Sequence, residues 1–273
     1  MGYYVSVEKN VNLFVEDLNP ECKETIVFLH GWPGSHELFE YQFNQLPKMG
    51  YRCIGIDQRG FGKSDKPYCG YDYDRLSDDV RAVMEALKLK NATLLGHSTG
   101  GAIAVRYMAR HKEFGVSRLV LCAAAAPSLI QRSYFPYGLQ REAVTDIIEG
   151  TYNDRPKMLE DFGNIFFYQL ITKPFMDWFF SLGLQGAGWA TAEVAESWLN
   201  EEQLFHDLEM IQAPTLILHG IHDKVCLFPL AEVQKDMIKN SRLIPFENSG
   251  HAVFYDERDR FNQALDQFIK GNM

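Results

Sequence analysis

The sequence predicts an α/β fold, in which a mostly parallel central sheet of about eight strands is flanked by helices. Short apolar runs typical of buried strands alternate with longer segments whose apolar residues recur at helical spacing. Glycine-rich turns follow several of these runs, and the alternation indicates right-handed crossover units with helices on both faces of the sheet. With 273 residues and 46% hydrophobic content, the chain is long enough to bury the core that such a fold needs.

The expected elements follow one another in a regular order. A hairpin is expected over Tyr3–Val7 and Val11–Glu16, and the apolar run Ile26–Leu29 is the first buried strand. A helix over Glu37–Pro47 follows, and the helix over Tyr73–Leu89 is amphipathic because its apolar residues recur at helical spacing. Further strands are expected at 52–57, 92–96, 118–122, 215–219 and 243–246, and further helices at 100–110, 230–238 and 261–269.

The alternation of strands and helices stops between residues 127 and 212. This stretch is rich in aromatic residues, contains glycines and prolines between short helix-prone segments, and offers no convincing strand. One interpretation is a set of additional core helices. The resumption of the strand–helix pattern afterwards favours an inserted helical cap, some of whose aromatics line a substrate pocket. We therefore expect a core of residues 1–126 and 213–273 and a cap of residues 127–212.

Composition narrows the classes of partner and compartment. The formal net charge of −9 argues against nucleic-acid binding, which needs a basic surface. No apolar run is long enough to span a bilayer, and no secretory signal is visible, so no membrane partner is expected. Five scattered cysteines without a C-x-x-C pair fit a reducing compartment, and we expect a cytoplasmic protein of undetermined oligomeric state. A His219–His222 metal site lacks a third ligand at suitable spacing, so neither metal nor cofactor is expected.

The segment Gly96-His97-Ser98-Thr99-Gly100 matches the G-x-S-x-G pattern of a nucleophile elbow. A serine at a tight strand-to-helix turn adopts a strained backbone conformation. This conformation is possible only if the residues packed closely around the turn lack side chains. Gly96 and Gly100 have no side chains and therefore meet this requirement. An expected strand ends just before Ser98 and an expected helix begins just after it, as the motif requires. Ser98 is therefore the candidate nucleophile.

A serine hydroxyl needs a base to take its proton, and the base needs an acid to fix its tautomer. In chains with this elbow the acid and then the histidine follow the serine, each in a loop after a strand. Asp223 lies just past the strand expected at 215–219, and His251 follows the strand expected at 243–246. These two residues are the candidate acid and base.

Other histidines and acids compete for these roles. His30 lies in a strand-end turn and His97 is beside the serine, so either is a candidate pocket residue instead of a base. Asp57 also ends a strand, but it precedes the serine, and its alternative role is to cap the turn Arg59–Gly62.

Acyl transfer also needs two backbone N–H groups that stabilise the oxyanion of the tetrahedral intermediate. One is expected from Thr99, the residue after the nucleophile, and the other from the loop His30-Gly31-Trp32-Pro33-Gly34. Pro33 has no N–H to donate, so Trp32 is the second candidate.

The segments at 30–34, 57–64, 96–101, 219–223 and 250–251 together resemble the α/β-hydrolases over essentially the whole chain. Within them the chain is similar to the carboxylesterases grouped with cofactor-free haloperoxidases and perhydrolases. Many of those proteins have Phe before and Met after the serine, where this chain has His97 and Thr99. Pro33 after the oxyanion-loop tryptophan resembles members with perhydrolase activity. The resemblance implies the α/β-hydrolase fold and its serine, aspartate and histidine triad.

These observations predict a serine-dependent carboxylesterase that hydrolyses small to medium acyl or aryl esters through an acyl-enzyme, with perhydrolysis as a side activity. The same serine, histidine and aspartate groups can also cleave lactones, amides, thioesters and carbon–carbon bonds, so a related serine hydrolase acting on one of these is an alternative. Haloalkane dehalogenases and epoxide hydrolases attack with a carboxylate, which the serine at position 98 disfavours. A non-catalytic ligand receptor on a hydrolase scaffold is the alternative of another class.

Overall fold

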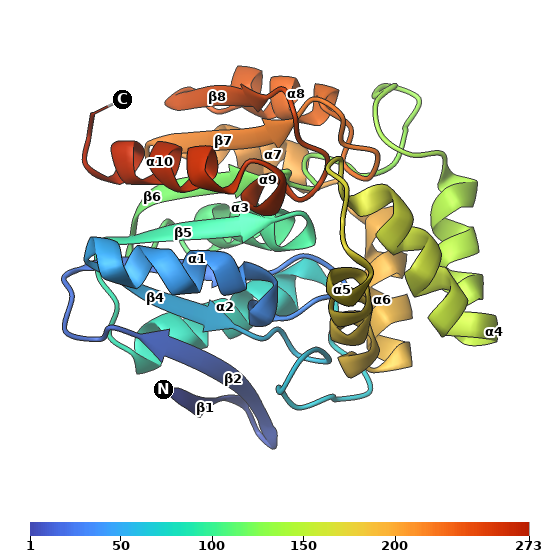
Figure 1. Cartoon of the computed structure of the whole chain (residues 1–273), viewed down its shortest axis with the longest axis horizontal. Helices are drawn as coiled ribbons and strands as arrows, with labels where there is room; N and C mark the ends of the chain where they lie inside the picture. Colours follow the sequence, from blue (N-terminus) through green and yellow to red (C-terminus); the bar gives the residue numbers. More distant parts are fainter. Residues whose placement is uncertain (273) are drawn as a thin grey trace.

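The computed structural model describes residues 1–272, and eight strands among them form one sheet (Figure 1). Across the sheet the strands are ordered β1 (Gly2–Glu8), β2 (Val11–Leu18), β4 (Tyr51–Ile56), β3 (Glu24–Leu29), β5 (Ala92–His97), β6 (Val116–Cys122), β7 (Thr215–Gly220) and β8 (Ser241–Phe246). The predicted α/β class, the hairpin and the further strands are thus confirmed.

Strand direction divides the sheet into an edge and a parallel body. The β1–β2 and β2–β4 pairs are antiparallel, whereas every pair from β4 to β8 is parallel. All residues of β5 and β7 are buried, which is why these strands read in the sequence as continuous apolar runs without alternation. Parallel strands also bring their carboxyl ends to one edge of the sheet, and the loops that follow them meet there.

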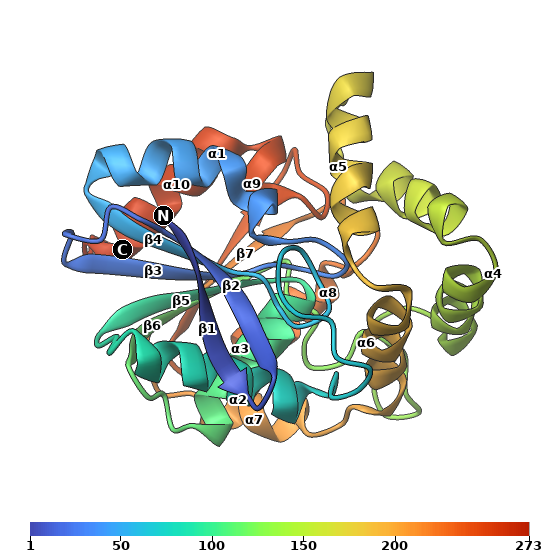
Figure 2. The same cartoon turned by 90° about the horizontal axis from the view of Figure 1, so that it is seen from below.

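Helices cover both faces of the sheet. Figure 2 shows α1 (Glu40–Gln45) and α10 (Arg258–Ile269) on one face, and α2 (Tyr73–Ala86) and α3 (Thr99–Arg110) on the other. The helix α8 (Pro229–Met237) connects β7 to β8, and the short α9 (Val253–Asp256) precedes α10.

The helix expected over 37–47 is not continuous. A 3₁₀ turn at His36–Phe39 precedes α1, and a second at Leu46–Met49 follows it. Pro47 has no N–H for a helical hydrogen bond and is tolerated in the first turn of this second segment.

Between β6 and β7 three helices lie at one end of the molecule, beyond the carboxyl ends of the parallel strands (Figure 1). They are α4 (Arg141–Phe166), α5 (Lys173–Gln185) and α6 (Gly188–Asn200), which we call the α4–α6 layer. The helix α4 bends at Asp154, whose backbone is not helical, two residues before Pro156. The short α7 (Leu204–Met210) follows, and an ion pair between Asp207 and Arg106 joins it to α3. The cap boundaries 127–212 stay a prediction.

Within residues 1–272, the structure contains no helix long and apolar enough to cross a membrane.

Candidate active site

Ser98 sits at the turn between β5 and α3 with φ 54° and ψ −122°, a conformation that residues other than glycine rarely adopt. The two glycines of the motif make the turn possible. A Cβ on Gly96 would collide with the backbone of Gly100, and a Cβ on Gly100 would collide with the carbonyl oxygens of Leu29 and His30. The local sequence thus holds the hydroxyl-bearing residue at the carboxyl end of the central strand, in the geometry of a nucleophile elbow.

Asp223 and His251 meet at the same edge of the sheet, after β7 and β8. The Nδ1 atom of His251 lies 2.8 Å from Oδ2 of Asp223, and both side chains are fully buried. The other oxygen of Asp223 accepts the backbone N–H groups of Val225 at 2.8 Å and Cys226 at 2.9 Å. These bonds fix the carboxylate, which in turn fixes the orientation of the imidazole.

Two opposing effects act on the Asp223 carboxyl. Burial alone would raise its pKa, but the imidazoles of His251 and His219 outweigh burial and hold the pKa of Asp223 well below its usual range. The Nε2 atom of His219 lies 3.3 Å from Oδ2 of Asp223 and 2.6 Å from the carbonyl oxygen of Cys226. Asp223 therefore stays ionised wherever a histidine titrates.

The Nε2 atom of His251 is buried and has no hydrogen-bond partner among residues 1–272. The hydroxyl of Ser98 does not bond to it within the described chain, and the Ser98 oxygen lies 3.9 Å from the sulfur of Cys226. His97 joins the two segments, because its Nε2 lies 3.0 Å from the carbonyl oxygen of His251 and the two rings are 4.6 Å apart. A serine–base contact that tightens only with substrate is common in unliganded enzymes.

Two backbone N–H groups are available beside Ser98. Those of Trp32 and Thr99 donate no hydrogen bond within residues 1–272. The loop before Trp32 lies against the nucleophile, since a Cβ on Gly31 would come within 2.9 Å of Cβ of Ser98. The indole Nε1 of Trp32 donates to the carbonyl oxygen of Thr191 in α6 at 2.9 Å, so the α4–α6 layer holds this loop in place.

Ser98, Thr99 and Trp32 line one cavity of about 150 Å³ between the sheet edge and the α4–α6 layer. Its walls are otherwise mostly apolar, and they consist of Leu129, Leu139, Ala143, Ile147, Phe162, Ile165, Trp198, Lys224 and Val225. Such a site suits an apolar group attached to a carbonyl that lies near Ser98.

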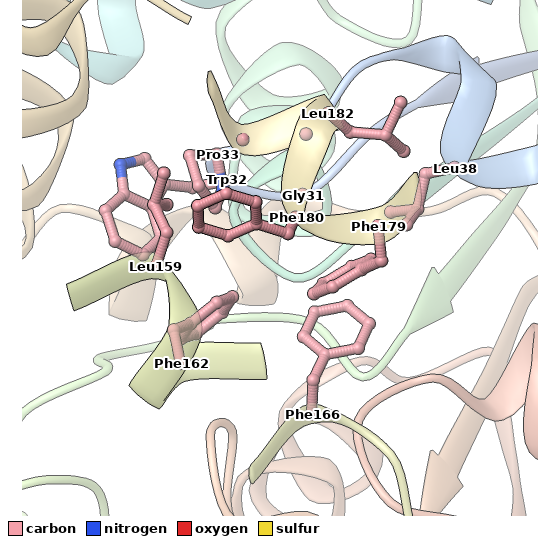
Figure 3. Close-up of a pocket in the computed structure, with 12 residues that line it drawn as sticks. Gly31, Trp32, Pro33, Leu38, Leu159, Phe162, Phe166, Phe179, Phe180 and Leu182 are labelled. Carbon is pink, nitrogen blue, oxygen red and sulfur yellow. The ribbon is translucent and has the colours of Figure 1, made fainter. Parts of the chain in front are cut away.

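A second, smaller pocket of about 20 Å³ is lined by Trp32 and Phe162 together with other residues (Figure 3). Phe166 from α4 and Phe179 and Phe180 from α5 point into it, and Ser98 does not line it. Trp32 and Phe162 line both spaces, so these two rings stand between the small pocket and the cavity that contains Ser98.

The competing residues have structural partners. His30 accepts the N–H of Gln58 at Nε2, and burial lowers its pKa. Burial, reinforced by the neighbouring His251, holds the pKa of His97 well below the ordinary value. The Oδ2 atom of Asp57 accepts the N–H of Lys63, which confirms its predicted role at the turn.

Sequence reasoning missed two residues next to these groups. Cys226 lies beside Ser98, and Asp256 accepts the N–H of Gly250, which precedes the candidate base. Neither belongs to a motif, and Cys226 reaches Ser98 only through the fold, so no sequence signal marked them. Among residues 1–272, no three histidine, cysteine, aspartate or glutamate side chains gather in an arrangement suited to a metal ion.

The sheet order, the elbow and the buried acid–histidine pair define a protein of the α/β-hydrolase class. Residues 24–258 match the family model described as alpha/beta hydrolase fold, and the chain belongs to that family.

Four known proteins illustrate the relationship. The chain is 47% identical to the AB hydrolase superfamily protein YisY of Bacillus subtilis, over 98% of this chain and 99% of that one. It is 30% identical to the bifunctional esterase/perhydrolase DCH of Acinetobacter calcoaceticus, over 99% of this chain and 100% of the other. A non-heme chloroperoxidase of Streptomyces lividans is also 30% identical, with 97% and 99% covered. The solved esterase from Exiguobacterium antarcticum superimposes with a TM-score of 0.96 at 43% identity, covering 99% of this chain and 100% of that one.

These relatives confirm the resemblance to esterases grouped with cofactor-free haloperoxidases. The protein is therefore a hydrolase of the α/β fold, related to esterases and to non-heme haloperoxidases.

Proposed function

We propose that the protein is a serine carboxylesterase that hydrolyses small to medium acyl or aryl esters, with Ser98 as nucleophile, His251 as base and Asp223 as the orienting acid. The observation that carries this proposal is the buried Asp223–His251 pair at 2.8 Å, whose free Nε2 faces no other partner in the described chain. An imidazole whose Nδ1 is held by a buried carboxylate, with Nε2 left free to take a proton, is the arrangement of a general base in a serine–histidine–aspartate triad. The esterases among the relatives support the same reaction class.

The reaction follows from these groups. The Ser98 oxygen attacks the ester carbonyl while its proton passes to Nε2 of His251, and Asp223 stabilises the imidazolium that forms. The N–H groups of Trp32 and Thr99 stabilise the oxyanion of the tetrahedral intermediate, each contributing about 3 kcal/mol. His251 then gives the proton to the leaving alcohol, and an acyl-enzyme remains. A water that transfers its proton to His251 attacks this acyl group, and the acid leaves as the proton returns to Ser98.

The α4–α6 layer acts in this proposal as a cap. Its residues Ala143, Ile147 and Phe162 line the cavity that contains Ser98, so the layer shapes the space for the acyl or aryl group. The cavity of about 150 Å³ favours short chains and single rings over long acyl chains. As part of the same proposal we assign the protein to the cytoplasm, because all five cysteines are free thiols.

Ester turnover tests the proposal directly. We expect the wild-type protein to hydrolyse p-nitrophenyl esters, and Ser98→Ala to lower kcat by about 10⁴-fold or more. The matched control Ser117→Ala, a serine that bonds to the carbonyl of Asn91 outside the site, should retain full activity. Mass spectrometry after treatment with an alkyl phosphonate should find the adduct on Ser98. An adduct on another residue, or equal rates for wild type and Ser98→Ala, would overturn the proposal.

Perhydrolysis is a second candidate activity, supported by the bifunctional esterase/perhydrolase relative and by Pro33 after Trp32. In it, hydrogen peroxide replaces water as the attacker of the acyl-enzyme, and a peracid leaves. With acetate, hydrogen peroxide and bromide present, peracid formation would be detected as bromination of a dye. Ser98→Ala should abolish this signal. A receptor on this scaffold would instead bind an ester and release negligible product over hours.

A further inference from the structure

The connection between α4 and α5 touches the loop that carries the candidate base. The carbonyl oxygen of Phe166, the last residue of α4, accepts the backbone N–H of His251 at 3.0 Å and that of Ala252 at 3.3 Å. The ring of Phe166 packs edge-on against the His251 imidazole, with centroids 5.0 Å apart. The α4–α6 layer therefore contacts the base itself, through both main chain and side chain.

The same connection also touches the loops before and beside this histidine. The Tyr168 ring stacks on the ring of His222, which precedes the candidate acid, with centroids 4.1 Å apart and planes 6° from parallel. The side chain of Gln169 donates to the carbonyl oxygen of Asn248 at 2.9 Å. The α4–α5 connection thus meets the loop after β7 and the loop after β8, and one side chain bonds both to this connection and to the loop after β8.

That side chain belongs to Asp256, the last residue of α9. Asp256 is half-buried. Its Oδ2 accepts the backbone N–H of Gly250 at 2.8 Å and that of Tyr168 at 3.0 Å, while its Oδ1 accepts the N–H of Gln169 at 3.1 Å. None of these three N–H groups donates to a backbone carbonyl within residues 1–272. A carboxylate is the strongest acceptor that a side chain offers to such donors. Asp256 is thereby the common partner of the His251 loop and of the α4–α5 connection.

We propose that Asp256 is a positioning residue, which sets His251 against Asp223 and Ser98 by joining the His251 loop to the α4–α5 connection. The inference rests on the proposed function, because it needs His251 to be the base. Asp256 does not line the cavity that contains Ser98, and within residues 1–272 it forms no hydrogen bond with Ser98. Its effect must therefore pass through Gly250 and Phe166 to His251. Displacement of a catalytic group by about 1 Å costs up to about 100-fold in rate.

Asp256→Asn is the sharpest test, because asparagine keeps the shape but replaces one acceptor oxygen by an NH₂ group that faces a donor. We expect kcat on p-nitrophenyl acetate to fall about 10- to 100-fold while KM changes less than about threefold. The acid limb of the kcat/KM profile should move to lower pH, because Asp223 stabilises the protonated form of a displaced His251 less. Asp256→Glu, which keeps the carboxylate, should recover part of the lost rate. The matched control Asp259→Asn alters an exposed aspartate in the next helix and should leave all three quantities unchanged.

A substrate-independent readout separates this inference from the proposed function. The Nδ1–H proton of His251, identified by its absence in His251→Gln, should give a low-field NMR signal that shifts or broadens in Asp256→Asn. If no ester is turned over but this signal responds, the esterase proposal fails, while the placement of His251 against Asp223 by Asp256 stands. If esters are hydrolysed and kcat, the acid limb and the NMR signal all stay as in wild type, the positioning role is wrong.

A purely structural role predicts a different pattern. Asp256→Asn would then lower the melting temperature, while the folded fraction would keep wild-type kcat and an unmoved acid limb, and this outcome would also overturn the inference. Should Asp256→Asn fail to fold, Gln169→Leu and Tyr168→Leu remove other contacts of the same connection and leave Asp256 in place. Each should lower kcat by a smaller factor in the same direction, and wild-type kcat in both would count against the proposal.

Discussion

His97 lies beside Ser98 and is buried among the rings of Phe39, Phe166 and Phe254. Its Nε2–H donates to the carbonyl oxygen of His251, while its Nδ1 has no partner in the described chain. Because burial and the adjacent His251 hold the pKa of His97 far down, this ring stays neutral at neutral pH and places no second positive charge next to the proposed base. The ring therefore acts as packing with one hydrogen bond.

The depressed pKa of His97 makes the stability of the protein depend on pH. In the unfolded chain the ring takes up a proton below about pH 6.5, whereas in the folded protein it does so only at much lower pH. Stability therefore falls as pH falls below about 6.5, by up to about 1.4 kcal/mol per pH unit. We expect His97→Phe, which fits the same aromatic contacts, to lose less stability than wild type between pH 7.5 and 5.5. Urea unfolding at the two pH values measures this difference.

His206 is exposed and provides the matched control. His206→Gln should keep the pH dependence of the wild type, while His30 should preserve part of that dependence in His97→Phe, because burial lowers its pKa too. Equal pH dependence in wild type and His97→Phe would contradict the assignment.

At the scale of elements, one arginine joins helices that are far apart in sequence. Arg106 in α3 is 7% exposed, and its guanidinium forms ion pairs with Asp207 of α7, with Glu201 after α6 at 2.7 Å, and with Asp74 of α2. Asp207 is itself only 4% exposed, and burial raises its pKa against the opposing effect of Arg106. This cluster of ion pairs connects the end of the α4–α6 layer to α2 and α3, which lie on one face of the sheet.

Removal of the Arg106 charge should therefore be costly. Arg106→Leu leaves a buried carboxylate without its counter-ion, and we expect the free energy of unfolding to fall by about 3–5 kcal/mol. Arg110→Leu, four residues on in the same helix, removes pairs that are largely exposed and should cost no more than about 1 kcal/mol. Guanidinium chloride unfolding of the two variants gives the comparison, and equal losses would show that the cluster is energetically unimportant.

Some strands, helices and site residues could be predicted from the sequence, and others could not. Strands β3 to β7 were predictable because buried parallel strands produce continuous apolar runs between glycine turns. The bounds of α4, α5 and α6 were not, since their apolar residues are not confined to one helical face and α4 is interrupted at Asp154. Ser98, Asp223 and His251 could be chosen as candidate site residues because each follows a strand and the three occur in the expected order. Asp256 could not, because it acts on backbone N–H groups that are brought together only by the fold.

At the scale of the whole molecule, the α4–α6 layer is fastened to both sides of the site. Thr191 of α6 accepts the indole N–H of Trp32, the proposed oxyanion residue, and Phe166 of α4 accepts the backbone N–H of His251, the proposed base. A hinged opening of this layer would break both bonds together. We infer that the layer keeps its position during turnover and that the dimensions of the cavity beneath it limit the substrate.

Filling that cavity should therefore change which esters are hydrolysed. Ala143 of α4 lines the cavity opposite the core, and Ala143→Phe takes up space that a longer acyl chain would occupy. A hexanoyl group carries four more methylenes than an acetyl group, and their burial contributes about 3 kcal/mol at about 0.8 kcal/mol each. We expect kcat/KM of Ala143→Phe to stay within about threefold of wild type on p-nitrophenyl acetate and to fall about 100-fold on the hexanoate, the rate equivalent of about 3 kcal/mol. Thr145→Phe places the same ring on the exposed face of this helix and should change neither value. A uniform loss across all acyl lengths in Ala143→Phe would mean that the acyl chain binds elsewhere.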